Sequence, residues 1–111
     1  MHPYHTQFLI LSAYLHRTKE EYEQALADLE LANKHLEDKS LEGELRSQIS
    51  LAYNEMGIYL YRQGKFTEAV TLFSEGLTFK SQDWGMLTNR GDCYKAQSEF
   101  VKALEDYLRA H

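Results

Sequence analysis

The sequence predicts an all-α fold, an α-solenoid of antiparallel helix pairs, and three observations support this prediction. The 111 residues include one Pro and six Gly, so turn material is scarce while residues that favour helices abound. Apolar residues recur at steps of three and four, and no segment shows a sustained alternation of apolar and polar residues. The third observation is an internal repeat of 34 residues, a spacing typical of stacked helix pairs.

The apolar spacing predicts six helices in the chain. In the stretch 20–36, for example, Tyr22, Leu26 and Leu29 share one helical face. We expect helix ends to be accurate to a few residues. The helices are expected near residues 5–17, 20–36, 41–63, 66–79, 83–96 and 99–110.

The internal repeat relates the segment 50–77 to the segment 84–111. Small residues in matched places would let neighbouring helices approach closely, and large residues would fill the gaps between them. Independent amphipathic helices would show apolar stripes without such matched places. The matched pairs, each 34 residues apart, are Gly57 and Gly91, Phe66 and Phe100, Ala69 and Ala103, and Phe73 and Tyr107.

This pattern of small and large residues resembles the tetratricopeptide repeat family. The resemblance implies a single domain over 1–111 with about three repeat units, at 6–39, 50–83 and, incomplete, 84–111. The first unit matches less well, because Ser12 and His16 stand where the family has apolar residues.

Residues 40–49 form an insert between the first two units. The insert has no Pro, and Ser40 can cap a helix start that Glu42 and Glu44 would stabilise. We therefore expect these residues to extend the first helix of the second unit backwards.

Both ends of the sequence look cut in the family register. Pro3 falls where a preceding unit would close, and the last unit has no polar capping helix after it. We therefore expect an excerpt from a longer array. That reading predicts an exposed apolar face around Phe100, Ala103, Leu104 and Tyr107, with self-association through the uncapped last helix.

Charge and composition exclude several classes of protein. A net charge of −5 without a Lys/Arg stripe argues against nucleic acid as a partner. The longest apolar stretch, 8–11, is too short to cross a membrane, and the start is no signal peptide. The single Cys93 forms neither an internal disulfide nor a zinc module. The expected compartment is the cytoplasm.

The sequence offers no catalytic or metal-binding constellation, so we expect a non-enzymatic protein without cofactor or metal. The five His residues form no pair spaced four apart on a helix. Cys93 has no His placed to activate it, and is expected to be a small buried filler. Arg90, Gly91 and Asp92 spell an integrin-type tripeptide, but we expect them on a regular helix rather than on an exposed loop.

The resemblance implies that the first helix of each unit lines an inner, concave groove. Tyr and Arg, which are enriched where protein partners bind, occur among the groove positions, and Arg17, Arg62 and Lys95 there favour a partner with apolar and acidic side chains. The apolar strip in the groove either receives a partner or packs on the insert or on missing repeats. The expected partner-binding residues are Tyr14, Arg17, Asn54, Ile58, Tyr61, Arg62, Asp92 and Lys95.

The groove does not match the chaperone-binding members of the family, which hold a C-terminal carboxylate with Lys and Asn residues. The corresponding places hold Ile10, Tyr14, Glu55, Gly85 and Asn89. Carboxylate-clamp binding of a chaperone is therefore not expected.

Two functions fit the sequence. The long connection before the second unit and the stretches 51–55, 61–64 and 89–94 resemble cilium-associated members of the family, which implies an interaction scaffold in a ciliary or flagellar assembly. The alternative is a cytoplasmic adaptor that binds an extended or helical peptide segment in its groove.

Overall fold

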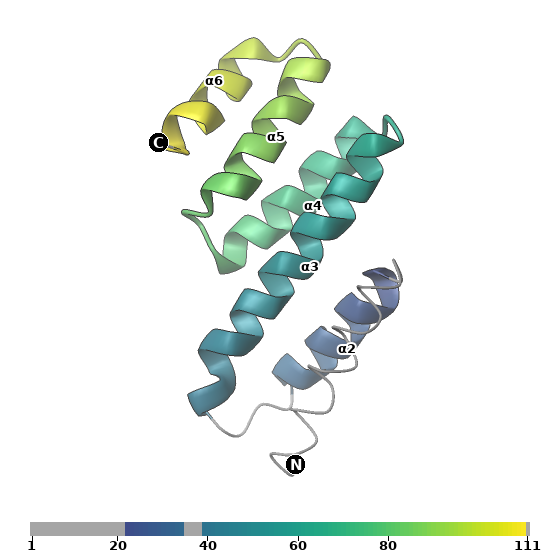
Figure 1. Ribbon diagram of the computed structural model, residues 1–111, viewed down its shortest axis with the longest axis vertical. Helices are drawn as coiled ribbons and strands as arrows, with labels where there is room; N and C mark the ends of the chain where they lie inside the picture. The colour runs from purple at the N-terminus through teal and green to yellow at the C-terminus, as the bar shows by residue number, and fades with distance from the viewer. Residues whose placement is uncertain (1–21, 35–38, 111) are drawn as a thin grey trace. The chain divides into compact units, whose positions relative to one another are not determined.

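The computed structural model describes residues 22–34 and 39–110. Over these residues the chain is helical and contains no strand, so the predicted all-α fold is confirmed (Figure 1). The helix expected at 5–17 lies outside the described residues. The elements are α2 (Tyr22–Lys34), the short 3-10 helix η1 (Lys39–Leu41), α3 (Glu42–Arg62), α4 (Phe66–Phe79), α5 (Trp84–Ala96) and α6 (Phe100–Arg109).

Helix α3 contains most of the insert as well as the start of the second repeat unit. Its 21 residues give a helix of about 32 Å. Glu42 and Glu44 lie in its first turn and Arg62 in its last, so that acidic and basic side chains stand at the ends where the helix dipole favours them. None of the described helices is both long and apolar enough to cross a membrane.

The chain divides into two compact units, Met1–Ala52 and Tyr53–His111. In the first, Leu29 and Ala32 of α2 and Leu45 and Ile49 of α3 are buried, at the helical spacing that the sequence shows. The second unit holds the rest of α3 together with α4, α5 and α6. In Figure 1 the last three helices run antiparallel in succession, each packed on the next.

The core of the second unit explains the 34-residue period. A Cβ placed on Gly57 would lie 2.5 Å from the ring of Phe73, and one on Gly91 would lie 2.7 Å from the ring of Tyr107. Each small residue therefore lets one large ring lie directly on the helix backbone, and the same contact occurs twice, one repeat apart. The core cluster consists of Ala69, Phe73, Leu77, Met86, Leu87 and Cys93.

The turn between paired helices also repeats. Gly64 has a φ of 78° and Ser98, 34 residues later, has a φ of 62°. The next residue in each turn donates its backbone N–H to a carbonyl five residues back, Lys65 to Leu60 at 3.0 Å and Glu99 to Tyr94 at 2.8 Å. Glycine fits this left-handed position without strain, whereas serine does not.

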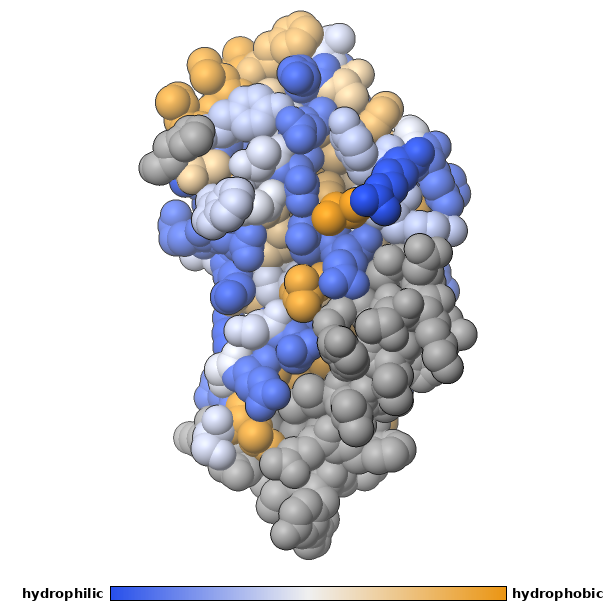
Figure 2. All heavy atoms as spheres, viewed as in Figure 1, coloured by the Kyte–Doolittle hydropathy of each residue, from blue (hydrophilic) through white to orange (hydrophobic). Residues whose placement is uncertain are grey.

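The outer face of α6 is apolar and exposed. Figure 2 shows hydrophobic side chains gathered over this helix. Four of them, Phe100, Val101, Leu104 and Leu108, are 57–73% exposed and are called the α6 stripe below. Of the residues predicted for this face, Phe100 and Leu104 belong to it.

The prediction was wrong for Ala103 and Tyr107. Ala103 is 3% exposed, and Tyr107 packs on Gly91 of α5. Residues 103 and 107 lie four apart, which is about one helical turn, so the two side chains point toward the preceding helix rather than outward.

Candidate functional site

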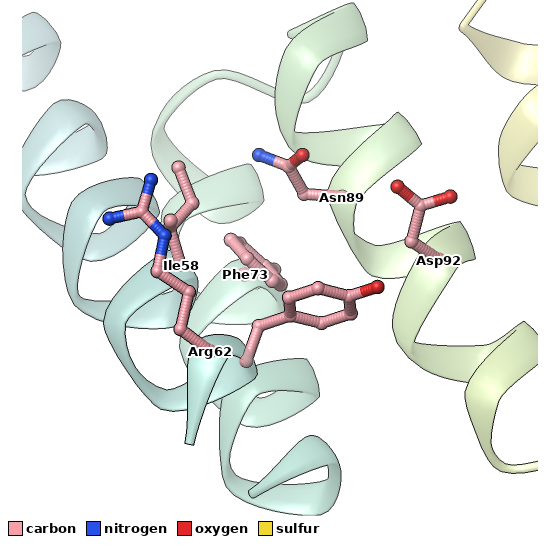
Figure 3. Close-up of a pocket in the computed structure, with 6 residues that line it drawn as sticks. Ile58, Arg62, Phe73, Asn89 and Asp92 are labelled. Atoms are coloured by element: carbon pink, nitrogen blue, oxygen red, sulfur yellow. The ribbon is translucent and has the colours of Figure 1, made fainter. Parts of the chain in front are cut away.

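A cavity of about 320 Å³ lies in the second unit, with walls from α3 and α5. Ile58 and Arg62 come from α3, Asn89 and Asp92 come from α5, and the buried ring of Phe73 on α4 lies at the floor between them (Figure 3). Tyr61 completes the lining. An apolar floor with aromatic and charged groups around it is the usual composition of a protein-binding pocket.

Helix spacing places the α3 residues on one face. Asn54, Ile58 and Tyr61 follow one another at steps of four and three along α3, so they lie along the same side of the helix. The absent side chain of Gly57, one residue before Ile58, allows the Phe73 ring to reach the α3 backbone. The cavity floor therefore depends on the same small residue that marks the repeat.

A hydrogen bond joins the two walls of the cavity. The Asn89 Nδ2 atom donates to Asn54 Oδ1 at 2.9 Å, and the pair is partly buried. Because amide groups form directed hydrogen bonds, this contact fixes the distance between α3 and α5 at one end of the cavity. Asn54 thus supports the cavity without lining it.

Asp92 is held in place from the side of α6. The Tyr107 hydroxyl donates to Asp92 Oδ1 at 2.5 Å. Burial raises the pKa of Tyr107 to about 12, and the hydrogen bond to Asp92 contributes to the rise. The phenol therefore stays protonated at neutral pH and remains a donor to the carboxylate.

The charged groups of the lining lie on opposite walls. Arg62 stands on α3 and Asp92 on α5, so the described lining residues supply one cation and one anion. Lys95, expected to add a second positive charge, is exposed near the end of α5 and does not line the cavity. The lining is balanced in charge rather than basic.

The structure brings five of the eight expected site residues together and separates one. Asn54, Ile58, Tyr61, Arg62 and Asp92 lie in or beside the cavity, while Lys95 lies apart from it. Tyr14 and Arg17 lie outside the described residues. The sequence analysis missed the roles of Phe73 and Asn89.

A signal for each of the two missed residues exists in the sequence. Asn89 stands three residues before Asp92, so it shares a face of α5 with it. Phe73 aligns with Tyr107, which is also packed on a Gly; the repeat pattern therefore marks it as a packing residue, and only the structure shows that it also forms a floor.

The tripeptide Arg90-Gly91-Asp92 is part of α5 and is occupied by internal contacts. Arg90 donates through Nε and Nη2 to the two carboxylate oxygens of Asp106, each at 2.7 Å, and through Nη1 to Ser74 Oγ at 3.1 Å. The hydrogen bonds from Asp106 raise the pKa of Arg90. Arg90 therefore ties α4, α5 and α6 together, and the tripeptide is a structural element rather than a recognition loop.

The described part of the chain supplies no reactive group to the cavity. Cys93 is fully buried, as predicted, and burial raises the pKa of its thiol to about 11, with a contribution from Asp92. A thiol with this pKa is a poor nucleophile at neutral pH. Among the described residues, no three His, Cys, Asp or Glu side chains gather where they could hold a metal ion.

Comparisons with known proteins agree with the repeat pattern. Over 97% of its length the chain is similar to curated proteins named tetratricopeptide repeat protein 16, at 29% identity in Macaca fascicularis, 28% in Homo sapiens and 26% in Mus musculus. The chain spans only 13–14% of the length of these relatives. No family model matches the chain. The predicted resemblance to tetratricopeptide repeat proteins is confirmed.

Proposed function

We propose that this chain, which resembles tetratricopeptide repeat proteins, is a non-enzymatic protein–protein interaction scaffold whose partner docks at the cavity between α3 and α5. One observation supports this most directly. Tyr61 and Arg62, two residue types that concentrate binding energy at interfaces, stand beside the apolar floor formed by Ile58 and Phe73.

The size of the cavity favours an anchoring side chain over a cofactor. Its volume of about 320 Å³ is at the lower end of the roughly 300–1,000 Å³ found for small-molecule pockets. A large apolar side chain of the partner would fill it and cover Phe73. Neighbouring groups of the partner would then meet Arg62 on one wall and Asp92 on the other.

The charges on the two walls define the partner further. Arg62 would pair with an acidic side chain, and Asp92 would accept a hydrogen bond from a basic side chain or a backbone N–H. The matching segment is therefore a helix or strand with an apolar anchor flanked by one acidic group and one donor. This differs from the purely acidic partner that Arg17, Arg62 and Lys95 suggest in the sequence.

The cavity is organised before any partner binds. The Asn54–Asn89 hydrogen bond holds the walls, and Tyr107 holds the Asp92 carboxylate. Because these side chains are already ordered, docking would lose less conformational entropy than docking on a mobile surface. A fixed receptor of this kind is suited to a scaffold.

We place this scaffold in a ciliary or flagellar assembly of the cytoplasm, because the linker placement and three sequence stretches resemble cilium-associated members of the family. The alternative is a cytoplasmic adaptor that takes a single peptide segment. Proximity labelling with the full-length protein in ciliated cells distinguishes the two. A scaffold would label many axonemal neighbours, and an adaptor would label one partner class throughout the cytoplasm.

The binding surface is tested with a partner identified in that way. The double variant Tyr61→Ala, Arg62→Glu should weaken its binding by more than about 2 kcal/mol while the helix content stays unchanged. Lys95→Glu is the matched control, because it reverses an exposed charge that does not line the cavity. If the double variant binds normally and substitutions at Glu44 and Arg46 abolish binding, the insert is the docking surface instead.

A further inference from the structure

The α6 stripe has an internal counterpart on α4. One repeat earlier, the residues at the places of Phe100, Val101, Leu104 and Leu108 are Phe66, Thr67, Val70 and Ser74. On α4 this face is covered by the next helix pair: Phe66 and Val70 pack against the core cluster, and the two polar residues accept hydrogen bonds. The stripe is therefore a helix-docking face repeated at a place where the described residues do not cover it.

The two faces differ in chemistry. On α4, Thr67 Oγ1 accepts from Gln97 Nε2 at 2.7 Å, and Ser74 Oγ accepts from Arg90 Nη1 at 3.1 Å. On α6 these acceptors are replaced by Val101 and Leu108. A helix like α5 would leave its amide and part of its guanidinium unpaired against this face, which is unfavourable for buried polar groups. The occupant must present apolar groups there.

The stripe itself offers such groups in a self-complementary arrangement. Val101, Leu104 and Leu108 follow at steps of three and four, the spacing of an apolar seam between two helices. A two-fold axis near Leu104 would set Leu104 against its own copy. It would also place Leu108 beside Phe100 of the other copy.

The charges on α6 fit the antiparallel arrangement. Glu99, Lys102, Glu105 and Arg109 are exposed and alternate in sign along the chain. An antiparallel pair centred near Leu104 sets Glu105 opposite Lys102 of the other copy, and Arg109 opposite Glu99. A parallel pair would set like charges together. Although the whole chain carries a net charge of −5, this surface is neutral and can approach a copy of itself.

We propose that α6 is a homodimerisation helix, and that two copies of the chain pair antiparallel through the α6 stripe about a two-fold axis near Leu104. This surface is separate from the cavity between α3 and α5. A scaffold built in this way would present two copies of that cavity, so the dimer would hold two partner segments at once.

Sedimentation of the 111-residue chain over a concentration series gives the first test. The chain should dimerise, and Leu104→Glu should weaken the dimer by roughly 30-fold or more, as loss of a central interface anchor does. Leu51→Glu, an equivalent substitution at an exposed site on α3, should leave dimerisation unchanged. A chain that stays monomeric at every concentration, or equal loss in both variants, would overturn the proposal.

Cysteine cross-linking tests the axis and the direction of pairing. Under oxidising conditions Leu104→Cys should form a disulfide between copies, while the parent stays uncross-linked because Cys93 is buried. Val101→Cys should not cross-link, because six residues of helix would separate the two copies of position 101, about 9 Å along the axis. Cross-linking of both variants would indicate a parallel pair and contradict the antiparallel register.

A charge swap tests the same register independently. Glu105→Lys alone should weaken the dimer, because it sets two Lys side chains against each other, and adding Lys102→Glu should restore it. Failure of the second substitution to restore dimerisation would refute the proposed pairing of these residues. Circular dichroism of each variant checks that α6 remains helical.

Discussion

Replacing Gly57 with Ala tests the helix contact on which both the repeat and the cavity depend. A Cβ at position 57 would lie 2.5, 2.7 and 2.8 Å from three carbons of the Phe73 ring, about 1 Å closer than the roughly 3.5–4.0 Å of ordinary carbon contacts. The ring is fully buried and has no open space into which it can swing. Either α3 or α4 must shift.

The size of the effect follows from two opposing contributions. Overpacking of a closely packed core typically destabilises by about 1–3 kcal/mol, and the contact of three ring atoms places this site at the upper end. Alanine is favoured over glycine inside a helix by about 1 kcal/mol. We therefore expect Gly57→Ala to lower the free energy of unfolding by about 1–2 kcal/mol.

Gly43 provides the matched control in the same helix. A Cβ at position 43 meets nothing within 4 Å, so Gly43→Ala keeps only the gain in helix propensity and should stabilise by up to about 1 kcal/mol. Urea denaturation followed by circular dichroism measures both variants. If Gly57→Ala proves as stable as the parent, the Gly57–Phe73 contact is not a close one and the packing argument fails.

Three further predictions concern the second unit. Ser98→Gly should stabilise by about 0.5–1 kcal/mol in thermal or urea unfolding, because glycine relieves the left-handed backbone at a φ of 62°; no gain would show that Ser98 is unstrained. Arg90→Ala should destabilise by about 3 kcal/mol, since it leaves the Asp106 carboxylate, only 5% exposed, without its partner, and Arg90→Lys should recover part of this loss because it keeps the charge but not the bidentate geometry; equal stability of the Ala variant and the parent would contradict the proposed role of Arg90. The raised pKa values of Tyr107, about 12, and Cys93, about 11, mean that the folded state holds these protons more tightly than the unfolded state, so stability should be complete at neutral pH and fall as the pH rises from about 9 toward 12; Tyr107→Phe should flatten this fall above pH 10, and an unchanged profile would show that Tyr107 does not titrate differently on folding.

The helices and their repeat were predictable because the contacts that create them are local in type and periodic in sequence. The stretch predicted at 66–79 is helix α4 at those residues, since Lys65 and Lys80 border an uninterrupted apolar pattern. The Gly57–Phe73 and Gly91–Tyr107 contacts appear in the sequence as matched small and large residues. A pattern of residue sizes therefore indicates which helices touch.

The sequence could not show which side of α6 is exposed. Ala103 and Tyr107 were expected on the outer face, but they face α5, because the repeat pattern marks contacts without saying whether a following or a preceding helix makes them. The Arg90–Asp106 pair was also not foreseen. Charged residues normally lie at the surface, and a buried pair between two helices has no periodic signature.

The candidate site shows the same division. Ile58, Tyr61 and Arg62 could be named because they stand at regular steps on one helix. The floor at Phe73 and the Asn54–Asn89 hydrogen bond depend on how three helices meet, which no single stretch of sequence specifies. Lys95 was expected in the groove from its register alone, but near the end of α5 it lies beyond the cavity.

The measurement that tests the proposed docking surface most directly compares two tyrosines of α3. Tyr59 and Tyr61 are each 39% exposed and lie two residues apart, but only Tyr61 lines the cavity. We predict that Tyr61→Ala weakens the dissociation constant of the identified partner by roughly 30-fold or more, whereas Tyr59→Ala changes it by less than about 3-fold. Equal affinity of the two variants, or a greater loss for Tyr59→Ala, would contradict docking at this cavity.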